Sequence, residues 1–171
     1  RDRRHQFRFC YYKGEFVEGL RHGRGTITLP DGFRYTGQWE AGQITGEGEA
    51  VYANGDRYEG SFLEGKRHGE GFATYANGET YEGAFREGKR HGTGTFTGTD
   101  GYVYVGSWVE GRIEGEGEAT YPNGATYDGA FVNGTPHGEG TITYADGGSY
   151  VGTWRNGVIE GQGVATYPNG S

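Results

Sequence analysis

The chain has 171 residues and a formal net charge of −7 at neutral pH. An acidic chain of this kind argues against nucleic-acid binding, which needs a basic surface that displaces counterions. The 37 glycines alternate with 14 Tyr, 9 Phe and 3 Trp, a composition that indicates buried aromatic area and excludes collagen and low-complexity sequence. Cys10 is the only cysteine, so no internal disulfide can form.

No apolar run approaches the roughly 20 residues of a membrane span, and no signal peptide is visible. The sequence does not begin with Met, and it ends at Asn169-Gly170-Ser171. We therefore interpret it as part of a longer protein, in the cytoplasm or at the periphery of a membrane.

Residues 1–11 differ from the rest of the chain. Phe7, Phe9 and Tyr11 alternate with polar residues, which predicts a strand that caps the array behind it; the end of a linker is the alternative. This segment is also basic, with a net charge of +3, which leaves −10 for the remainder. Its arginines are candidates for contact with anionic lipid: Arg1, Arg3, Arg4 and Arg8.

From Tyr12 onward, one pattern returns every 23 residues. In each copy the first residue is Tyr, the third is Gly, the fifth is Phe or Trp and the eighth is Gly. A Gly-x-Gly follows, and Asn-Gly or Asp-Gly comes near the end. The seven copies span 12–34, 35–57, 58–80, 81–103, 104–126, 127–149 and 150–171.

Each copy predicts a pair of short strands, because nothing in it shows the period of a helix. In the third copy we expect strands at Tyr58–Phe62 and Gly71–Tyr75, with a glycine-rich loop at Glu64–His68 between them. Asn77-Gly78 predicts a type I′ hairpin turn, since both residue types tolerate positive φ. The hairpins together predict an all-β, elongated repeat array that forms one twisted, curved antiparallel sheet.

Strand alternation places Tyr58, Gly60 and Phe62 on one face, together with Ala73 and Tyr75. A glycine between two aromatic residues lets a ring lie over the bare backbone. We therefore predict a ladder of stacked Tyr and Phe or Trp rings through the copies.

Three positions of the repeat vary together. Where the fifth residue is Trp, the tenth is Ile and the eleventh is not His, as in Trp39, Ile44 and Thr45. Where the fifth is Phe, the eleventh is His: His22, His68, His91 and His137. This correlation predicts that the positions touch and that the indole packs on Ile in the loop.

A repeat of the form Tyr-x-Gly-x-Phe/Trp-x-x-Gly-x-x-His-Gly-x-Gly resembles the MORN (membrane occupation and recognition nexus) family, over residues 12–171. Its departures are Thr45, Glu114 and Glu160 at the His position. The resemblance implies a curved sheet of hairpins with an aromatic groove. It also implies arrays that tether membranes, dock proteins or build scaffolds and are not enzymes.

A single-layer sheet covers one side of its ladder, so we expect the uncovered side to form a partner-binding groove. The candidate residues are Tyr35, Trp39, Tyr58, Phe62, Tyr81, Phe85, Tyr104, Trp108, Tyr127, Phe131 and Trp154.

Other chemistry is poorly supported. The histidines are spaced too widely to share an ion, and only His5 with Cys10, across a dimer, offers an alternative metal site. The repeated Glu residues indicate a solvated face. The Gly-x-Gly pairs lack the features of a phosphate loop. We expect no catalytic residues, no metal and no cofactor.

The sequence therefore predicts a non-enzymatic scaffold that binds a basic or amphipathic segment of a partner protein along the groove. Two alternatives remain: a module that associates with membrane phospholipid, and a regulatory array attached to a catalytic domain elsewhere in the protein. A homodimer through open sheet edges is a further expectation.

Overall fold

The computed structural model describes residues 9–169, and these contain strands and turns without a helix. Each strand has seven or nine residues. In chain order they are β1 (Tyr11–Val17), β2 (Leu20–Thr28), β3 (Arg34–Glu40), β4 (Gln43–Val51), β5 (Arg57–Leu63), β6 (Lys66–Thr74), β7 (Thr80–Arg86), β8 (Lys89–Thr97), β9 (Val103–Val109), β10 (Arg112–Thr120), β11 (Thr126–Val132), β12 (Thr135–Thr143), β13 (Ser149–Arg155) and β14 (Val158–Thr166).

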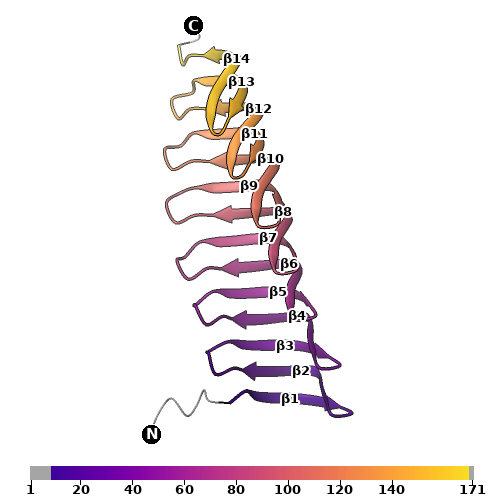
Figure 1. Cartoon of the computed structure of the whole chain (residues 1–171). Helices are drawn as coiled ribbons and strands as arrows, with labels where there is room; N and C mark the ends of the chain where they lie inside the picture. Colours follow the sequence, from indigo (N-terminus) through magenta and orange to yellow (C-terminus); the bar gives the residue numbers. More distant parts are fainter. Residues whose placement is uncertain (1–8, 170–171) are drawn as a thin grey trace. The chain divides into compact units, whose positions relative to one another are not determined.

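The chain divides into two compact units between Lys89 and Arg90. In the first unit, β1 to β7 follow one another in sequence order, and each strand pairs antiparallel with the next (Figure 1). The register repeats: Tyr58 of β5 lies opposite Ala73 of β6 on one side and Ala50 of β4 on the other.

The second unit contains β9 to β14 and all of β8 except Lys89, its first residue. These strands also pair antiparallel in sequence order, with Tyr104 of β9 opposite Ala119 of β10. The prediction of an all-β array of antiparallel hairpin repeats is therefore confirmed. None of the described residues belongs to a helix that is long and apolar enough to cross a membrane.

The two-residue turn of each hairpin lies at a different position from the one predicted, which was the Asn-Gly or Asp-Gly near the end of the repeat. Strand β5 ends at Leu63 and β6 begins at Lys66, so only Glu64 and Gly65 connect them. Their φ values of 49° and 84° are those of a type I′ turn. The predicted loop Glu64–His68 is therefore wrong in its second half, because Lys66, Arg67 and His68 belong to β6.

Asn77-Gly78 lies instead in the longer connection between β6 and β7. Gly78 N donates to Tyr75 O at 2.9 Å, and the Asn77 side chain accepts from Glu79 N at 3.0 Å. Gly78 has φ of 96°, whereas Asn77 is not among the residues with positive φ. The type I′ assignment was wrong here because Asn77 caps the turn through its side chain rather than by entering the left-handed region.

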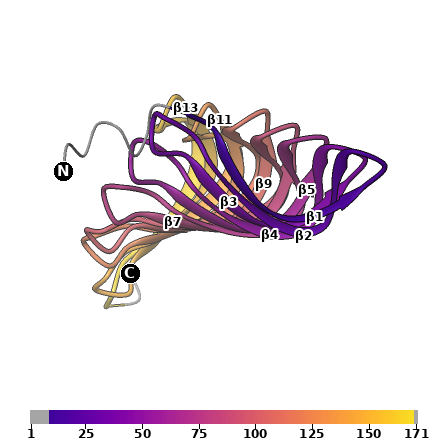
Figure 2. The same ribbon diagram turned by 90° about the horizontal axis from the view of Figure 1, so that it is seen from below.

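The strands bend along their length, as the view in Figure 2 shows. In the β5–β6 hairpin the pairing shifts between Gly60 and Phe62, and on the partner strand Gly69 takes φ of 93°. Bulges and glycines at such positions let a sheet curve. The bend allows a single layer of strands to enclose its own aromatic side chains.

These side chains form the core. Tyr58 is 1% exposed and Phe62 is 5% exposed. The Tyr58 hydroxyl donates to Ser61 O at 2.8 Å, and a Cβ on Gly71 would overlap the Tyr58 ring. The predicted ring over a bare glycine backbone is confirmed, and the ring comes from the same repeat as the glycine.

Much of the N-terminal segment lies outside the described residues, including His5 and the four arginines Arg1, Arg3, Arg4 and Arg8. Phe9 and Cys10 precede β1, and Tyr11 is its first residue. The capping strand at 1–11 therefore stays a prediction.

Candidate binding site

All eleven candidate groove residues are buried, with at most 7% of each residue exposed. The first unit holds Tyr35, Trp39, Tyr58, Phe62, Tyr81 and Phe85, and the second holds Tyr104, Trp108, Tyr127, Phe131 and Trp154. They stabilise the fold as a core, so a partner can reach them only where the surrounding side chains leave a hollow. Their contact with a partner stays a prediction.

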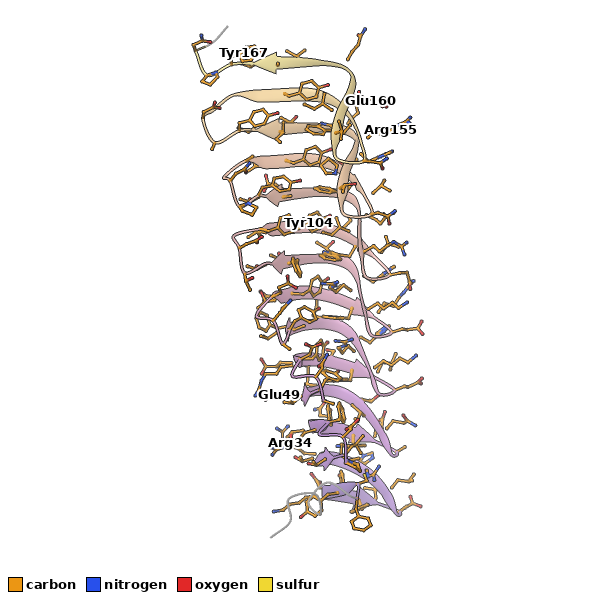
Figure 3. The ribbon with its side chains drawn as sticks, turned by 60° about the vertical axis from the view of Figure 1, so that its left-hand side comes forward. Arg34, Glu49, Tyr104, Arg155, Glu160 and Tyr167 are labelled. Carbon is orange, nitrogen blue, oxygen red and sulfur yellow. The ribbon has the colours of Figure 1, made fainter. Side chains whose placement is uncertain are left out.

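Within each unit the rings pack edge to face, as the predicted ladder requires. The Tyr58 ring centroid lies 5.0 Å from that of Phe62 in its own repeat and 5.0 Å from that of Phe85 in the next. In the second unit Tyr104 bridges Trp108 and Phe131 in the same way, at 5.5 and 5.0 Å. Tyr104 lies among these rings over the strands in Figure 3. Such pairs contribute about 0.5–1.5 kcal/mol each beyond the area they bury.

Three repeats place an arginine over the ladder, a feature that sequence reasoning missed. Arg21, Arg67 and Arg90 occupy the tenth position of the repeat, directly before its histidine. The Arg67 guanidinium lies 5.5 Å from the Phe85 ring centroid and donates to Gly88 O at 2.8 Å. The tenth position was assigned to a loop, but it belongs to a strand, and its side chain points onto the rings. The exchange of Arg for Ile at this position between repeats is the sequence feature from which a contact with the rings could have been predicted.

A cavity of about 290 Å³ opens beside the ladder of the second unit. Its walls include the rings of Phe96, Tyr102 and Trp108, together with Ile113, and its charged lining residues are Arg90 and Arg112. The Arg90 guanidinium lies 4.6 Å from the Trp108 ring centroid and 5.6 Å from that of Phe96. Phe96 and Tyr102 are half-buried at this cavity, whereas Trp108 is buried.

The fourth repeat, which supplies Phe96 and Tyr102 to this cavity, departs from the common pattern at three positions. Phe96 stands where four other repeats have Ala50, Ala73, Ala119 and Ala165. Gly98 stands where five repeats have Tyr, and the Cβ of Tyr102 would lie 3.5 Å from a Cβ on Gly98. Tyr102 lies in the connection before β9. Its ring is therefore beside the position that a tyrosine occupies in five other repeats.

The connection that carries Tyr102 is fixed by backbone hydrogen bonds. Gly98 N donates to Tyr102 O at 2.7 Å, and Tyr102 N donates to Asp100 Oδ1 at 3.0 Å. Burial raises the pKa of Tyr102 to about 12. The phenol is therefore neutral at physiological pH, and the cavity wall is uncharged except for its arginines.

The first unit has a wider groove with similar walls and a different charge. Phe33 and Tyr52 pack at 5.4 Å, and Arg67 lies 5.3 Å from the Tyr52 ring centroid. However, Asp31 and Asp56 also line this groove of about 630 Å³. The two hollows therefore differ in volume and in whether carboxylates line the site together with the arginine.

The carboxylates of the strands lie mostly on the face opposite the ladder. Glu49 and Glu59 stand directly across from each other on β4 and β5, as do Glu118 and Asp128 on β10 and β11. Like charges in this position weaken a sheet. These four carboxylates lie on the face opposite the rings, whereas Arg21, Arg67 and Arg90 lie over the rings.

The histidines at the eleventh position take part in the fold. His68 Nδ1 accepts from Glu87 N at 3.2 Å, and His22, His91 and His137 accept from the equivalent N–H groups at 3.1–3.3 Å. Within the described residues, no group of three or more His, Cys, Asp or Glu is placed to hold a metal ion. Cys10 is exposed and is not part of any disulfide.

Comparison with known proteins adds to this picture. A model of the MORN repeat matches residues 12–34, 35–57, 58–80, 81–101, 104–126, 127–149 and 150–171. The chain belongs to the MORN-repeat family. A search of curated proteins gave no significant match for this MORN-repeat chain.

Among solved structures, the chain is similar to the SAS-4 (dCPAP) TCP domain of Drosophila melanogaster, solved in complex with a proline-rich motif of Ana2 (dSTIL). The TM-score is 0.56 at 18% identity, and the alignment covers 95% of this chain and 87% of the other. At 18% sequence identity, this similarity shows only that the two chains share a fold.

Proposed function

We propose that this MORN-repeat chain is a non-enzymatic binding module that holds an extended segment of a partner protein against its aromatic side. The observation that carries the proposal is the cavity lined by Phe96, Tyr102 and Trp108 beside Arg90. Aromatic-lined hollows of this kind suit extended peptides, which bury side chains in pockets at intervals.

Two further observations support the proposal. The MORN family is a binding and scaffolding family rather than a catalytic one. A domain of similar fold was solved with a proline-rich motif of another protein, which is an extended ligand.

A displayed random-peptide library, selected on the intact chain, tests the proposal. Each selected peptide is then measured against two variants, Phe96→Ala on the aromatic side and Phe72→Thr on the opposite face, where Phe72 is 40% exposed. We expect peptides that lose affinity for Phe96→Ala and keep it for Phe72→Thr. Peptides with the reverse preference, or no selected peptide at all, would contradict the proposal.

The membrane alternative stays a prediction, because Arg1, Arg3, Arg4 and Arg8 lie outside the described residues. Co-sedimentation with anionic vesicles at low and high salt would test it, with the four arginines changed to Gln as the control. The attached catalytic domain and the homodimer through sheet edges also stay predictions. The flanking sequence of the whole protein and light scattering, respectively, would test them.

A further inference from the structure

We propose that the cavity of the second unit receives a proline from an acidic segment of the partner, whose carboxylates pair with Arg90 and Arg112. This inference rests on the proposed function and specifies the chemistry of its ligand. It differs from the expectation from net charge, which favours a basic partner.

The size and the walls of the cavity favour one small apolar side chain. A volume of about 290 Å³ lies at the lower end of the range for small-molecule sites. Three aromatic rings and Ile113 form its apolar wall. Proline fits such walls well, because it is rigid and holds the segment in an extended conformation at little cost in entropy.

The charge at the cavity favours an acidic neighbour for that proline. Arg90 and Arg112 line the cavity, and none of its other lining residues is Asp or Glu. Glu114 is not among the lining residues, although its carboxylate accepts a hydrogen bond from the N–H of Asn133, which is one of them. The charged side chains in the lining are therefore both cationic, within a chain whose net charge is −7. Arginine pairs well with carboxylates, because its planar group offers several donors in a fixed geometry.

The chain also contains its own comparison site. The groove of the first unit has Phe33, Tyr52 and Arg67 but adds Asp31 and Asp56. Two carboxylates in the lining repel an acidic ligand, so the same segment should discriminate between the two units. Both sites have aromatic walls but differ in volume as well as charge, so a comparison of acidic with basic peptides isolates the effect of charge.

The test uses the full chain and short synthetic peptides of repeating Pro-Pro-Glu, Pro-Pro-Gln and Pro-Pro-Lys. Binding is followed by NMR through the indole N–H signals of Trp39, Trp108 and Trp154. We expect the Pro-Pro-Glu peptide to shift the Trp108 signal selectively, and the Pro-Pro-Lys peptide to bind at least about tenfold more weakly. Equal affinity for the Glu and Lys peptides, or a larger shift at Trp39 than at Trp108, would overturn the inference.

Matched variants use residues that the chain already carries at equivalent positions. Phe96→Ala adopts the residue of Ala50, Ala73 and Ala119, and Arg90→Ile adopts that of Ile44 and Ile113. Each should weaken the Pro-Pro-Glu peptide about tenfold, whereas Arg67→Ile in the first unit should leave its affinity unchanged. Arg112→Gln alters an exposed side chain and so serves as the second charge variant should Arg90→Ile fail to fold. Full affinity in Arg112→Gln and Phe96→Ala would overturn the inference.

The two proposals fail in different ways. If none of the three peptides shifts the Trp108 signal, but library selection still yields segments that depend on Phe96, this inference is wrong and the proposed function stands. If selection yields no such segment, the proposed function is wrong.

Discussion

His68 in β6 accepts a hydrogen bond at Nδ1 from the backbone N–H of Glu87, which lies in the tight turn of the next repeat. The distance is 3.2 Å. The previous repeat makes the same link with a different side chain, because Thr45 Oγ1 accepts from Glu64 N at 3.0 Å. The eleventh position therefore joins each of these hairpins to the turn of the next, and an acceptor atom is what the position requires.

This link predicts that the side chain at position 68 protects the Glu87 amide. We expect His68→Ala to lower the protection factor of the Glu87 amide several-fold in hydrogen exchange, because the N–H loses its acceptor. The same variant should lower the free energy of unfolding by about 1 kcal/mol. The Glu64 amide is the internal control, since its acceptor is Thr45 Oγ1.

A matched variant sharpens the test of this contact. His68→Thr adopts the residue of the preceding repeat, where Thr45 Oγ1 accepts from Glu64 N. The Glu87 amide should therefore keep its protection in His68→Thr and lose it in His68→Ala. Equal loss of protection in the two variants would show that an acceptor atom is not what the position requires.

Gly71 tests the contact between tyrosine rings and bare backbone. A Cβ at this position would overlap the Tyr58 ring, which is buried and cannot move away. We expect Gly71→Ala to lower the free energy of unfolding by about 1–3 kcal/mol, measured by urea denaturation. The control is Gly65→Asn, because nothing lies within 4 Å of a Cβ there and asparagine tolerates the φ of 84°. Equal losses in both variants would mean that glycine matters only for backbone freedom.

The sequence predicted the faces of the strands and the aromatic ladder, because strand alternation and the fixed period leave few other arrangements. It also predicted that Trp39 and Ile44 touch, and they are cross-strand partners in β3 and β4. Thr45, which varies with them, acts on the next turn instead. Correlated variation identified the group of residues but not the role of each.

The turns and the cavity were harder to predict, for local reasons. Both Glu64-Gly65 and Asn77-Gly78 suit a turn, and the shift of register beside Gly60 decides which of them is tight. The cavity depends on Tyr102 lying beside the position of a missing tyrosine at Gly98. That arrangement follows from the path of a connecting segment, which the repeat pattern does not describe.

The buried tyrosines predict loss of stability in alkali. Burial is the largest cause that raises the pKa of Tyr35, Tyr104 and Tyr127 to about 12, from an ordinary value of 10.0. Because the pKa is raised in the folded state, the stabilisation is fully present below pH 10 and is lost as the pH rises through about 12.

We therefore expect tyrosinate absorbance and loss of the far-ultraviolet β-sheet signal to rise together above pH 10. Tyr104→Phe should remove one of the late-ionising groups and weaken the fold, since the Tyr104 hydroxyl donates to Ser107 O at 2.8 Å. If all 14 tyrosines ionise before the β-sheet signal changes, the ladder is not as buried as the structure describes.

Some hairpins pair Trp with Ile across the strands, as at Trp39 and Ile44, whereas others pair Phe with Arg. We expect the two members of such a pair to be coupled in their effect on the free energy of unfolding, which single substitutions do not reveal. Trp39 Nε1 donates to the buried Gly25 O at 3.0 Å, and Ile44 lies opposite its ring. Trp39→Phe loses this bond and leaves Gly25 O without its side-chain donor, at a cost of about 1–3 kcal/mol. Ile44→Arg adds a charge near Arg21, whose guanidinium already lies 5.5 Å from the Trp39 ring centroid. Both single variants should therefore be less stable than the wild type.

The double variant recreates the pairing seen at Phe62 and Arg67 in the next repeat. We expect it to be more stable than the sum of the single losses by about 1 kcal/mol in a double-mutant cycle. The control cycle combines Trp39→Phe with Gln43→Arg, an exposed position that pairs with Glu40 instead of Trp39. Additive losses of stability in the first cycle would mean that residues 39 and 44 act independently. Losses that are additive only in the control cycle would support the view that Trp with Ile and Phe with Arg are two alternative, internally compatible pairs.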